Sequence, residues 1–152
     1  MKRDPILAIR LPAADGRMAE FAVHEPRRFE RPARPFTRIA YAAAHVVADP
    51  LSTKEPWLEP AIDWEATLAF RRHLWSWGLA VAEAMDTAQR GMGLDWPNAL
   101  ELIRRSVAEA KGIAGARIAC GAGTDQLAPG PHPLERIVAA YEEQCEAIER
   151  AG

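Results

Sequence analysis

The chain has 152 residues, of which 49% are hydrophobic and 26% charged, a composition typical of one globular domain with a core of its own. Its formal net charge of −2 provides no strong field for nucleic acid or acidic membranes, and no apolar run reaches the roughly 18 residues of a membrane helix. The short, interrupted apolar run near the N-terminus does not resemble a signal peptide. We therefore expect a cytoplasmic protein with neither nucleic acid nor a membrane as partner.

The cysteines and histidines do not form a metal-binding pattern. Cys120 and Cys145 are far apart and fall within apolar patterns, so free buried thiols are favoured over a disulfide or a metal site. No two of the four histidines stand four residues apart, the spacing that places two ligands on one helix face. The sequence predicts no metal site and no cofactor.

Residues 1–35 are predicted to form a separate N-terminal element. Residues 5–24 alternate in the manner of a β-hairpin, with Asp15-Gly16 at its turn and Gly16 at a positive φ. Residues 25–35 hold three prolines among charged residues, which is typical of an extended connector. We interpret this element as a lid or plug rather than a site.

Three short strands are predicted in the remainder, residues 36–152. The first covers residues 38–44 and is rich in alanine, which suits a crowded parallel sheet. The second, residues 79–85, opens into the polar turn Asp86-Thr87-Ala88-Gln89-Arg90-Gly91. The third covers residues 117–123 and leads into Thr124-Asp125-Gln126.

A helix is predicted after each strand. Ile62-Asp63-Trp64 recurs as Leu94-Asp95-Trp96, and in both copies the aspartate is a good N-cap. Gly78 and Gly112 are placed to end these two helices. The third begins at Leu134, ends at Gly152 and has a predicted apolar face, composed of Leu134, Ile137, Val138, Tyr141, Cys145 and Ile148.

The strands begin roughly one βα unit apart, as in barrel repeats. The predicted fold class is therefore α/β: an N-terminal hairpin followed by about three βα units of a TIM (β/α)₈ barrel, with right-handed crossovers. Since the chain stops where a fourth strand is due, we expect a truncated barrel.

In such folds the loops after the carboxyl ends of the strands bind ligands. His45 and Asp49 follow the first strand; His45 is either a proton-transfer group or a structural residue. Asp86 is either a general base or a cap of its own turn. The full predicted set comprises Asp86, Thr87 and His45 as catalytic residues and Glu83, Asp125, Gln89, Arg90, Asp49, Gly121 and Gly123 as substrate-binding residues.

For three other members of this set, Gly121, Gly123 and Glu83, the sequence also permits a purely structural role. Gly121 and Gly123 either admit a ligand to the backbone or relieve crowding. Glu83 shares the bulky face of its strand with Val81, so we expect it beneath a helix, where a buried carboxylate needs a partner. It is then either a salt-bridged structural residue or a site residue.

The arginine pairs 71–72 and 104–105 are expected on solvated faces or in ion pairs, and the tryptophans in helix-to-sheet packing.

Four segments carry a family resemblance: RIAYAAAHVVADPL (38–51), FRRHLW (70–75), EAMDTAQRGMGLDWP (83–97) and RIACGAGTDQL (117–127). They resemble an uncharacterised bacterial family of dihydrodipicolinate synthase-like proteins (DUF993-type), related to the (β/α)₈ class I aldolases and lyases. The resemblance covers nearly the whole chain from Pro5, and only the first three of eight barrel units.

The resemblance implies an aldolase-like active site in the full-length family. The superfamily's Gly-Thr-Thr-Gly-Glu turn falls on residues 86–90, where only Thr87 keeps its residue type, and Ala88 and Arg90 depart from it. Keto-acid recognition therefore need not carry over. The superfamily's Schiff-base lysine lies on a sixth strand, and Lys2, Lys54 and Lys111 are not placed to replace it.

Two functions follow as hypotheses. In the first, the chain is the N-terminal segment of an aldolase- or lyase-like enzyme acting on a small oxo or hydroxy substrate, and is inactive alone. In the second, it is a non-catalytic assembly module completed by self-association or by a separately encoded remainder. Open strand edges and a half-covered apolar face also predict a homo-oligomer.

Overall fold

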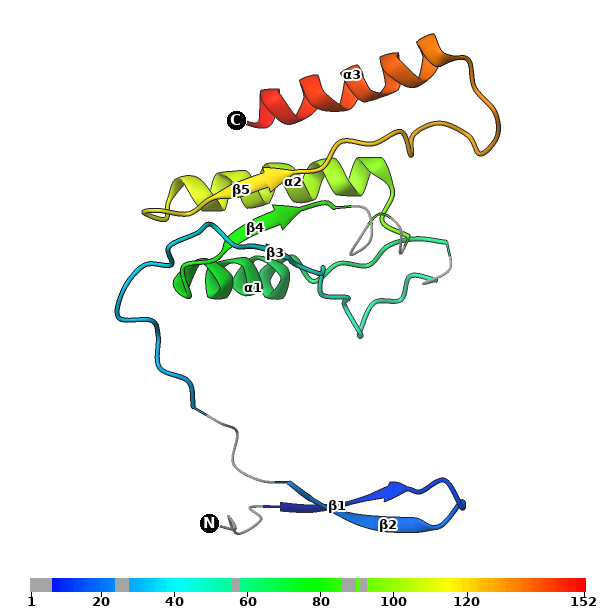
Figure 1. Cartoon of the computed structure of the whole chain (residues 1–152). Helices are drawn as coiled ribbons and strands as arrows, with labels where there is room; N and C mark the ends of the chain where they lie inside the picture. The colour runs from blue at the N-terminus through cyan, green and yellow to red at the C-terminus, as the bar shows by residue number, and fades with distance from the viewer. Residues whose placement is uncertain (1–6, 24–27, 56–57, 86–89, 91–92) are drawn as a thin grey trace. The chain divides into compact units, whose positions relative to one another are not determined.

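The computed structural model describes residues 7–23, 28–55, 58–85, 90 and 93–152. The chain divides into two compact units, Met1–Arg31 and Pro32–Gly152, and their boundary falls within the predicted connector (Figure 1). Among the described helices, none is both long and apolar enough to cross a membrane.

The first unit contains the predicted β-hairpin. Strands β1 (Leu7–Pro12) and β2 (Met18–Val23) pair in antiparallel register from Leu7 opposite Val23 to Pro12 opposite Met18. Gly16 has a φ of 78° in the turn between them, a conformation that glycine adopts without steric cost. The hairpin and its turn glycine are confirmed.

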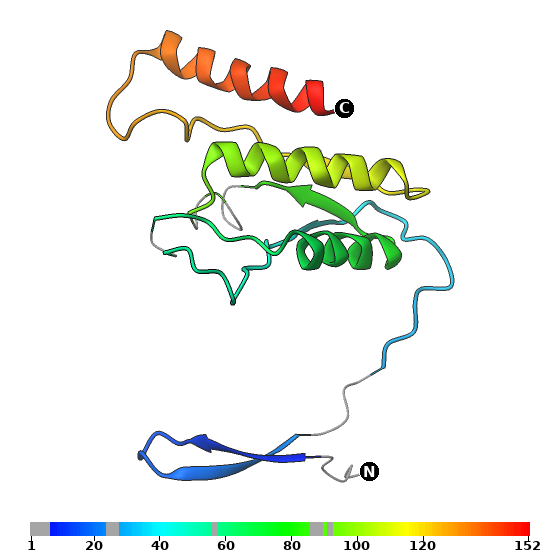
Figure 2. The same ribbon diagram turned by 180° about the vertical axis from the view of Figure 1, so that it is seen from behind.

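The second unit is a mixed α/β structure with a small parallel sheet and three helices. Strands β3 (Tyr41–Ala43), β4 (Ala80–Glu83) and β5 (Ile118–Cys120) lie in the order β3-β4-β5 and are all parallel. Helices α1 (Trp64–Ser76) and α2 (Trp96–Lys111) follow β3 and β4, and α3 (Leu134–Ala151) follows β5. Figures 1 and 2 show α1 and α2 alongside the sheet. The three strands are confirmed, each shorter than predicted.

The starts of α1 and α2 are built alike. The Asp63 carboxylate accepts a hydrogen bond from the Ala66 amide at 2.9 Å, and the Asp95 carboxylate accepts one from the Asn98 amide at 3.0 Å. These bonds satisfy amides that have no partner within the helix. The recurring Asp-Trp pair in the sequence is therefore a repeated helix start, as predicted.

The two faces of the sheet differ. On one face the fully buried Val81 and Glu83 lie among side chains of α1 and α2, and Trp75 of α1 packs on Val81. On the other face Ala43, Ala82 and Ala119 stand side by side across the three strands, and the two outer alanines are exposed. The bulky face meets the helices, as the period of two predicts, and the small face is left uncovered by the described residues.

The predicted apolar face of α3 packs only in part: Ile148 lies against the core, whereas Leu134, Val138, Tyr141 and Cys145 are exposed. Its buried residues are Ala140, Gln144 and Ala147, whereas Leu134 is 71% and Tyr141 46% exposed. The two alanines permit close contact with the rest of the unit, and Gln144 joins a polar network at the end of β5. A buried amide with satisfied hydrogen bonds therefore sets the orientation of this helix.

A fully buried ion pair joins α1 to the sheet. Arg71 and Glu83 both have side chains with 0% exposure, and the guanidinium donates to both carboxylate oxygens, at 2.9 and 2.8 Å. It also donates to the carbonyls of Ala44, His45 and Thr67, so all five of its N–H donors are bonded. Of the two interpretations of Glu83, the salt-bridged residue is the one found, and Arg71 is its partner.

We expect Arg71→Met to lower the free energy of unfolding by about 3–5 kcal/mol, because it leaves the Glu83 carboxylate buried without its cation. The double variant Arg71→Met/Glu83→Leu should recover part of this loss. Urea unfolding followed by tryptophan fluorescence measures both. Arg72→Met is the control, since Arg72 pairs with Glu65 and Glu109 at a partly exposed position. Equal losses for the two single variants would contradict the role assigned to the buried pair.

Candidate functional site

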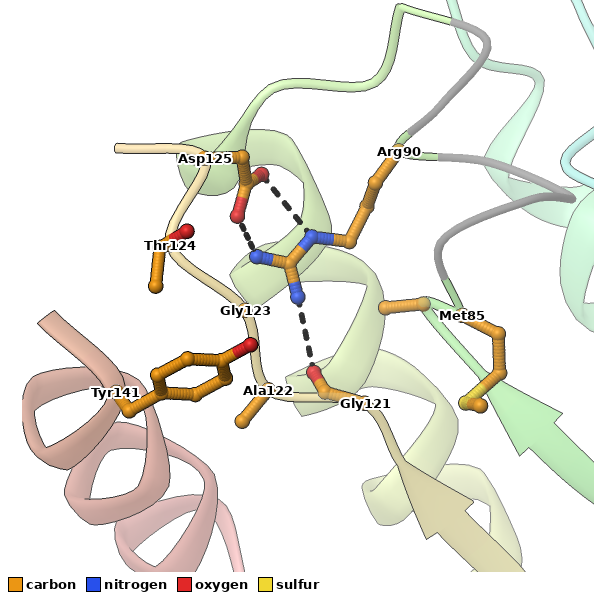
Figure 3. Close-up of a pocket in the computed structure, with 9 residues that line it drawn as sticks. Met85, Arg90, Gly121, Ala122, Gly123, Thr124, Asp125 and Tyr141 are labelled. Atoms are coloured by element: carbon orange, nitrogen blue, oxygen red, sulfur yellow. Dashed lines mark hydrogen bonds and ion pairs between the residues drawn. The ribbon is translucent and has the colours of Figure 1, made fainter. Parts of the chain in front are cut away.

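A cavity of about 320 Å³ lies at the carboxyl ends of β4 and β5 (Figure 3). Ala84 and Met85 line it from the end of β4, residues 121–125 from the loop after β5, and Arg90 and Tyr141 from either side. We call it the strand-end cavity. Its size is at the lower end of the range for ligand sites, so it suits a small molecule.

The wall of the strand-end cavity contains a second arginine–carboxylate pair. Arg90 Nε donates to Asp125 at 3.0 Å, and a second N–H of Arg90 donates to the other Asp125 oxygen. The remaining terminal nitrogen donates to the Gly121 carbonyl at 3.0 Å (Figure 3). The guanidinium also lies 5.2 Å above the Trp96 ring, a cation–π contact. The Arg90 side chain is 5% exposed and that of Asp125 34%, so the carboxylate is the more accessible partner.

Gln144, fully buried on α3, connects this pair to the loop after β5. Its side-chain oxygen accepts from the Gly123 amide at 2.7 Å and from Arg90 at 2.6 Å. Its side-chain nitrogen donates to Asp125 at 3.0 Å and to Gln126 at 2.6 Å. One amide thus satisfies four polar groups and fixes the loop against both α3 and Arg90.

Gly121 and Gly123 occupy crowded positions. A Cβ at Gly121 would lie 2.9 Å from the Ala84 carbonyl oxygen, closer than van der Waals contact allows. A Cβ at Gly123 would lie 3.2 Å from the Arg90 guanidinium and 3.3 Å from the Asp125 carboxylate. Of the two predicted interpretations, relief of crowding therefore accounts for Gly121, which lets the two strand ends meet, and Gly123 leaves room for the Arg90–Asp125 pair.

The backbone turns sharply where β4 enters the cavity. Ala84 has a φ of 50°, in the left-handed region that costs an L-residue about 1–2 kcal/mol. The Glu83 carboxylate accepts from the Ala84 amide at 3.1 Å, and the Glu83 carbonyl accepts from the Gly121 amide at 3.0 Å. The Arg71–Glu83 pair therefore supports this turn from beneath the sheet, although Glu83 itself does not line the cavity.

Two hydroxyl groups complete the cavity wall. Thr124 lies in the loop after β5, and the Tyr141 ring reaches from α3 toward the same loop (Figure 3). Within the part of the chain that the structure describes, neither side-chain hydroxyl makes a hydrogen bond. Both can therefore donate to or accept from a ligand at no cost to the protein's own bonds.

The structure brings four of the predicted site residues together: Arg90, Asp125, Gly121 and Gly123. His45 is exposed at the end of β3, where its carbonyl accepts from Arg71, and it does not line the cavity. Asp49 accepts from the Leu51 amide at 2.9 Å, a local turn contact outside the cavity. Asp86, Thr87 and Gln89 lie outside the described residues, and their predicted roles stay predictions.

Sequence reasoning missed Gln144 and assigned Tyr141 only to a packing face. No residue type on α3 marks Gln144 as buried, because its burial depends on which face of the helix the tertiary structure covers. Thr124 was named only as part of a loop. Its position directly after a strand was a sufficient reason to include it.

Among the described residues, no group of three or more histidine, cysteine, aspartate or glutamate side chains is arranged to hold a metal ion. The two described lysines also lie away from the cavity. Lys54 pairs with Glu59 in an exposed loop, and Lys111 donates to the Ala151 carbonyl at the ends of α2 and α3. Neither is placed for imine chemistry at the strand ends.

Fold and site together define a parallel α/β protein with a polar cavity at the carboxyl ends of two adjacent strands. Residues 9–152 match the model of the family described as "Protein of unknown function (DUF993)", and the chain belongs to that family. No curated protein matches the chain.

The two cysteines should differ in reactivity. Burial, with a smaller contribution from the Glu83 carboxylate, raises the pKa of the partly buried Cys120 thiol to about 11, whereas Cys145 is exposed. At pH 8 only about one Cys120 thiol in a thousand is then the reactive thiolate. We expect iodoacetamide to alkylate Cys145 at least tenfold faster than Cys120. Peptide mass spectrometry measures both alkylation rates.

The Cys120 alkylation rate should also keep rising from pH 8 to pH 10 without a plateau, since its pKa lies above this range. Unfolding in urea is the control, because it should make the two rates similar. Equal rates in the folded chain would show that the Cys120 environment is not the one described.

Proposed function

We propose that this chain provides the substrate-binding wall of an aldolase- or lyase-like enzyme of the (β/α)₈ type, acting on a small oxo or hydroxy substrate. The observation that carries the proposal is the strand-end cavity, because ligands of parallel α/β proteins bind at the carboxyl ends of the strands. Resemblance to aldolase-related proteins supplies the reaction class, and it does so by analogy.

The arrangement of the sheet supports a barrel-like architecture. The strands follow one another in chain order, and α1 and α2 contact β4 and each other on one face. The opposite face carries the row Ala43, Ala82 and Ala119, whose small side chains suit the crowded interior of a barrel. Under this proposal the nucleophile comes from outside the described residues.

The test is a titration of the uniformly ¹⁵N-labelled chain with small oxo and hydroxy compounds, followed by amide NMR shifts. We expect shifts at the amides of Gly121, Ala122, Gly123 and Thr124, which line the cavity. Tyr141→Phe should weaken binding about threefold to tenfold, the effect of one hydrogen bond.

Tyr41→Phe is the matched control, because Tyr41 is a half-exposed tyrosine on β3 that does not line the cavity. The proposal fails when no compound shifts the loop amides. It also fails when the two tyrosine variants weaken binding equally.

A second candidate function is assembly, and one observation favours it. Leu134, Val138 and Tyr141 form an exposed apolar stripe on α3, and among the described residues β3 and β5 each pair on one side only. Exposed edges and apolar stripes are the surfaces through which chains associate. In this alternative the chain is a non-catalytic module that associates with another copy or a separately encoded partner.

Size-exclusion chromatography with light scattering tests self-association. The assembly hypothesis predicts a discrete dimer or larger closed oligomer that Val138→Glu dissociates, because the substitution puts a charge into the stripe. Ala139→Glu, which adds the same charge one residue away, is the control and should leave the mass unchanged. A cooperatively melting monomer would contradict self-association.

A further inference from the structure

The charge balance of the strand-end cavity restricts which ligands it can bind. Of the described residues that line it, Arg90 and Asp125 alone are charged, and they are paired with each other. This wall therefore has no net positive charge to attract an anion.

Arg90 is also committed geometrically. Two of its N–H groups donate to the Asp125 oxygens, a third to Gln144 and a fourth to the Gly121 carbonyl. At least four of its five donors are thus bonded within the protein. A carboxylate ligand is bound best by two parallel N–H donors of a guanidinium, and Asp125 already takes that edge of Arg90.

The accessible groups of the cavity suit a ligand that is not a carboxylate. The Asp125 side chain is 34% exposed and retains acceptor capacity, and an ionised carboxylate can accept bonds but not donate them. It therefore pairs with a ligand hydroxyl. The hydroxyls of Thr124 and Tyr141 can donate to a ligand carbonyl, and Met85 and Ala122 offer apolar contact for carbon atoms.

We infer that the strand-end cavity binds an uncharged, hydroxylated carbonyl compound and disfavours the corresponding carboxylate. The inference rests on the proposed function and specifies its substrate class. Asp125 accepts from the ligand hydroxyl, and Arg90 serves to hold Asp125 in place. A carboxylate at this position would have to share Arg90 with Asp125 or approach a like charge.

Dihydroxyacetone and hydroxypyruvate are matched probes. Both are hydroxyketones with three carbons, and they differ only in whether the third carbon is an alcohol or a carboxylate. In NMR titrations of the whole chain, we expect dihydroxyacetone to shift the loop amides of residues 121–124 with at least tenfold higher affinity than hydroxypyruvate.

Asp125→Asn should lower the ratio of the two affinities, dihydroxyacetone over hydroxypyruvate, at least tenfold. The substitution removes the like charge and leaves Arg90 without its counter-ion. The nearly isosteric amide retains an oxygen for Arg90, and amide dispersion shows whether the variant is folded. Glu143→Gln is the control: it removes a nearby α3 carboxylate that does not line the cavity, and it should leave the selectivity unchanged.

Equal or tighter binding of hydroxypyruvate by the wild-type chain would overturn the inference while leaving the proposed function intact. An unchanged preference in folded Asp125→Asn would also overturn it. When neither probe nor any other small oxo or hydroxy compound shifts the loop, the proposed function itself fails, and the inference fails with it. If Asp125→Asn does not fold, the wild-type comparison alone decides.

Discussion

The buried ion pair between Arg71 and Glu83 is the interaction on which the geometry of the second unit depends. Removing two charges from water costs several kcal/mol for each ion, and the pair tolerates this cost only because its hydrogen bonds are complete. Arg71 bonds both Glu83 oxygens and three backbone carbonyls, two of which, those of Ala44 and His45, lie just beyond β3. One side chain of α1 thereby fixes the carboxyl ends of two adjacent strands.

This constraint reaches the strand-end cavity through the backbone. The Glu83 carboxylate accepts from the amide of Ala84, which adopts a φ of 50°, and the Glu83 carbonyl accepts from the amide of Gly121, the first residue after β5. The close approach of the two strand ends leaves no space for a side chain at Gly121. Ala84 is the strained residue, and the hydrogen bonds of the buried Arg71–Glu83 pair offset the cost of its strain. The end of β4 that lines the cavity is therefore held in position by contacts outside the cavity.

Local rules in the sequence were sufficient for most of the fold. Period-two alternation predicts the hairpin and the strands, and the aspartate N-caps predict where α1 and α2 begin. The rule that ligand sites follow strand ends also led to the prediction of Arg90 and Asp125, which line the strand-end cavity. Contacts between distant segments were not predictable in this way. Neither the pairing of Arg71 with Glu83 nor the burial of Gln144 follows from residue type, because each depends on which helix face the tertiary structure covers.

Two of the arginine–carboxylate pairs, Arg71–Glu83 and Arg90–Asp125, have different physical roles, and exposure distinguishes them. Both carboxylate and guanidinium are fully buried in the Arg71–Glu83 pair, so no solvent or ligand reaches either charge. In the Arg90–Asp125 pair the cation is 5% exposed and the carboxylate 34%, so the accessible part is an acceptor with a fixed position. A hydroxyl can bond that acceptor without breaking the pair, whereas an anion must compete with it. The same chemical pair thus joins α1 to the sheet at one position and, under the binding inference, selects the ligand's charge at the other.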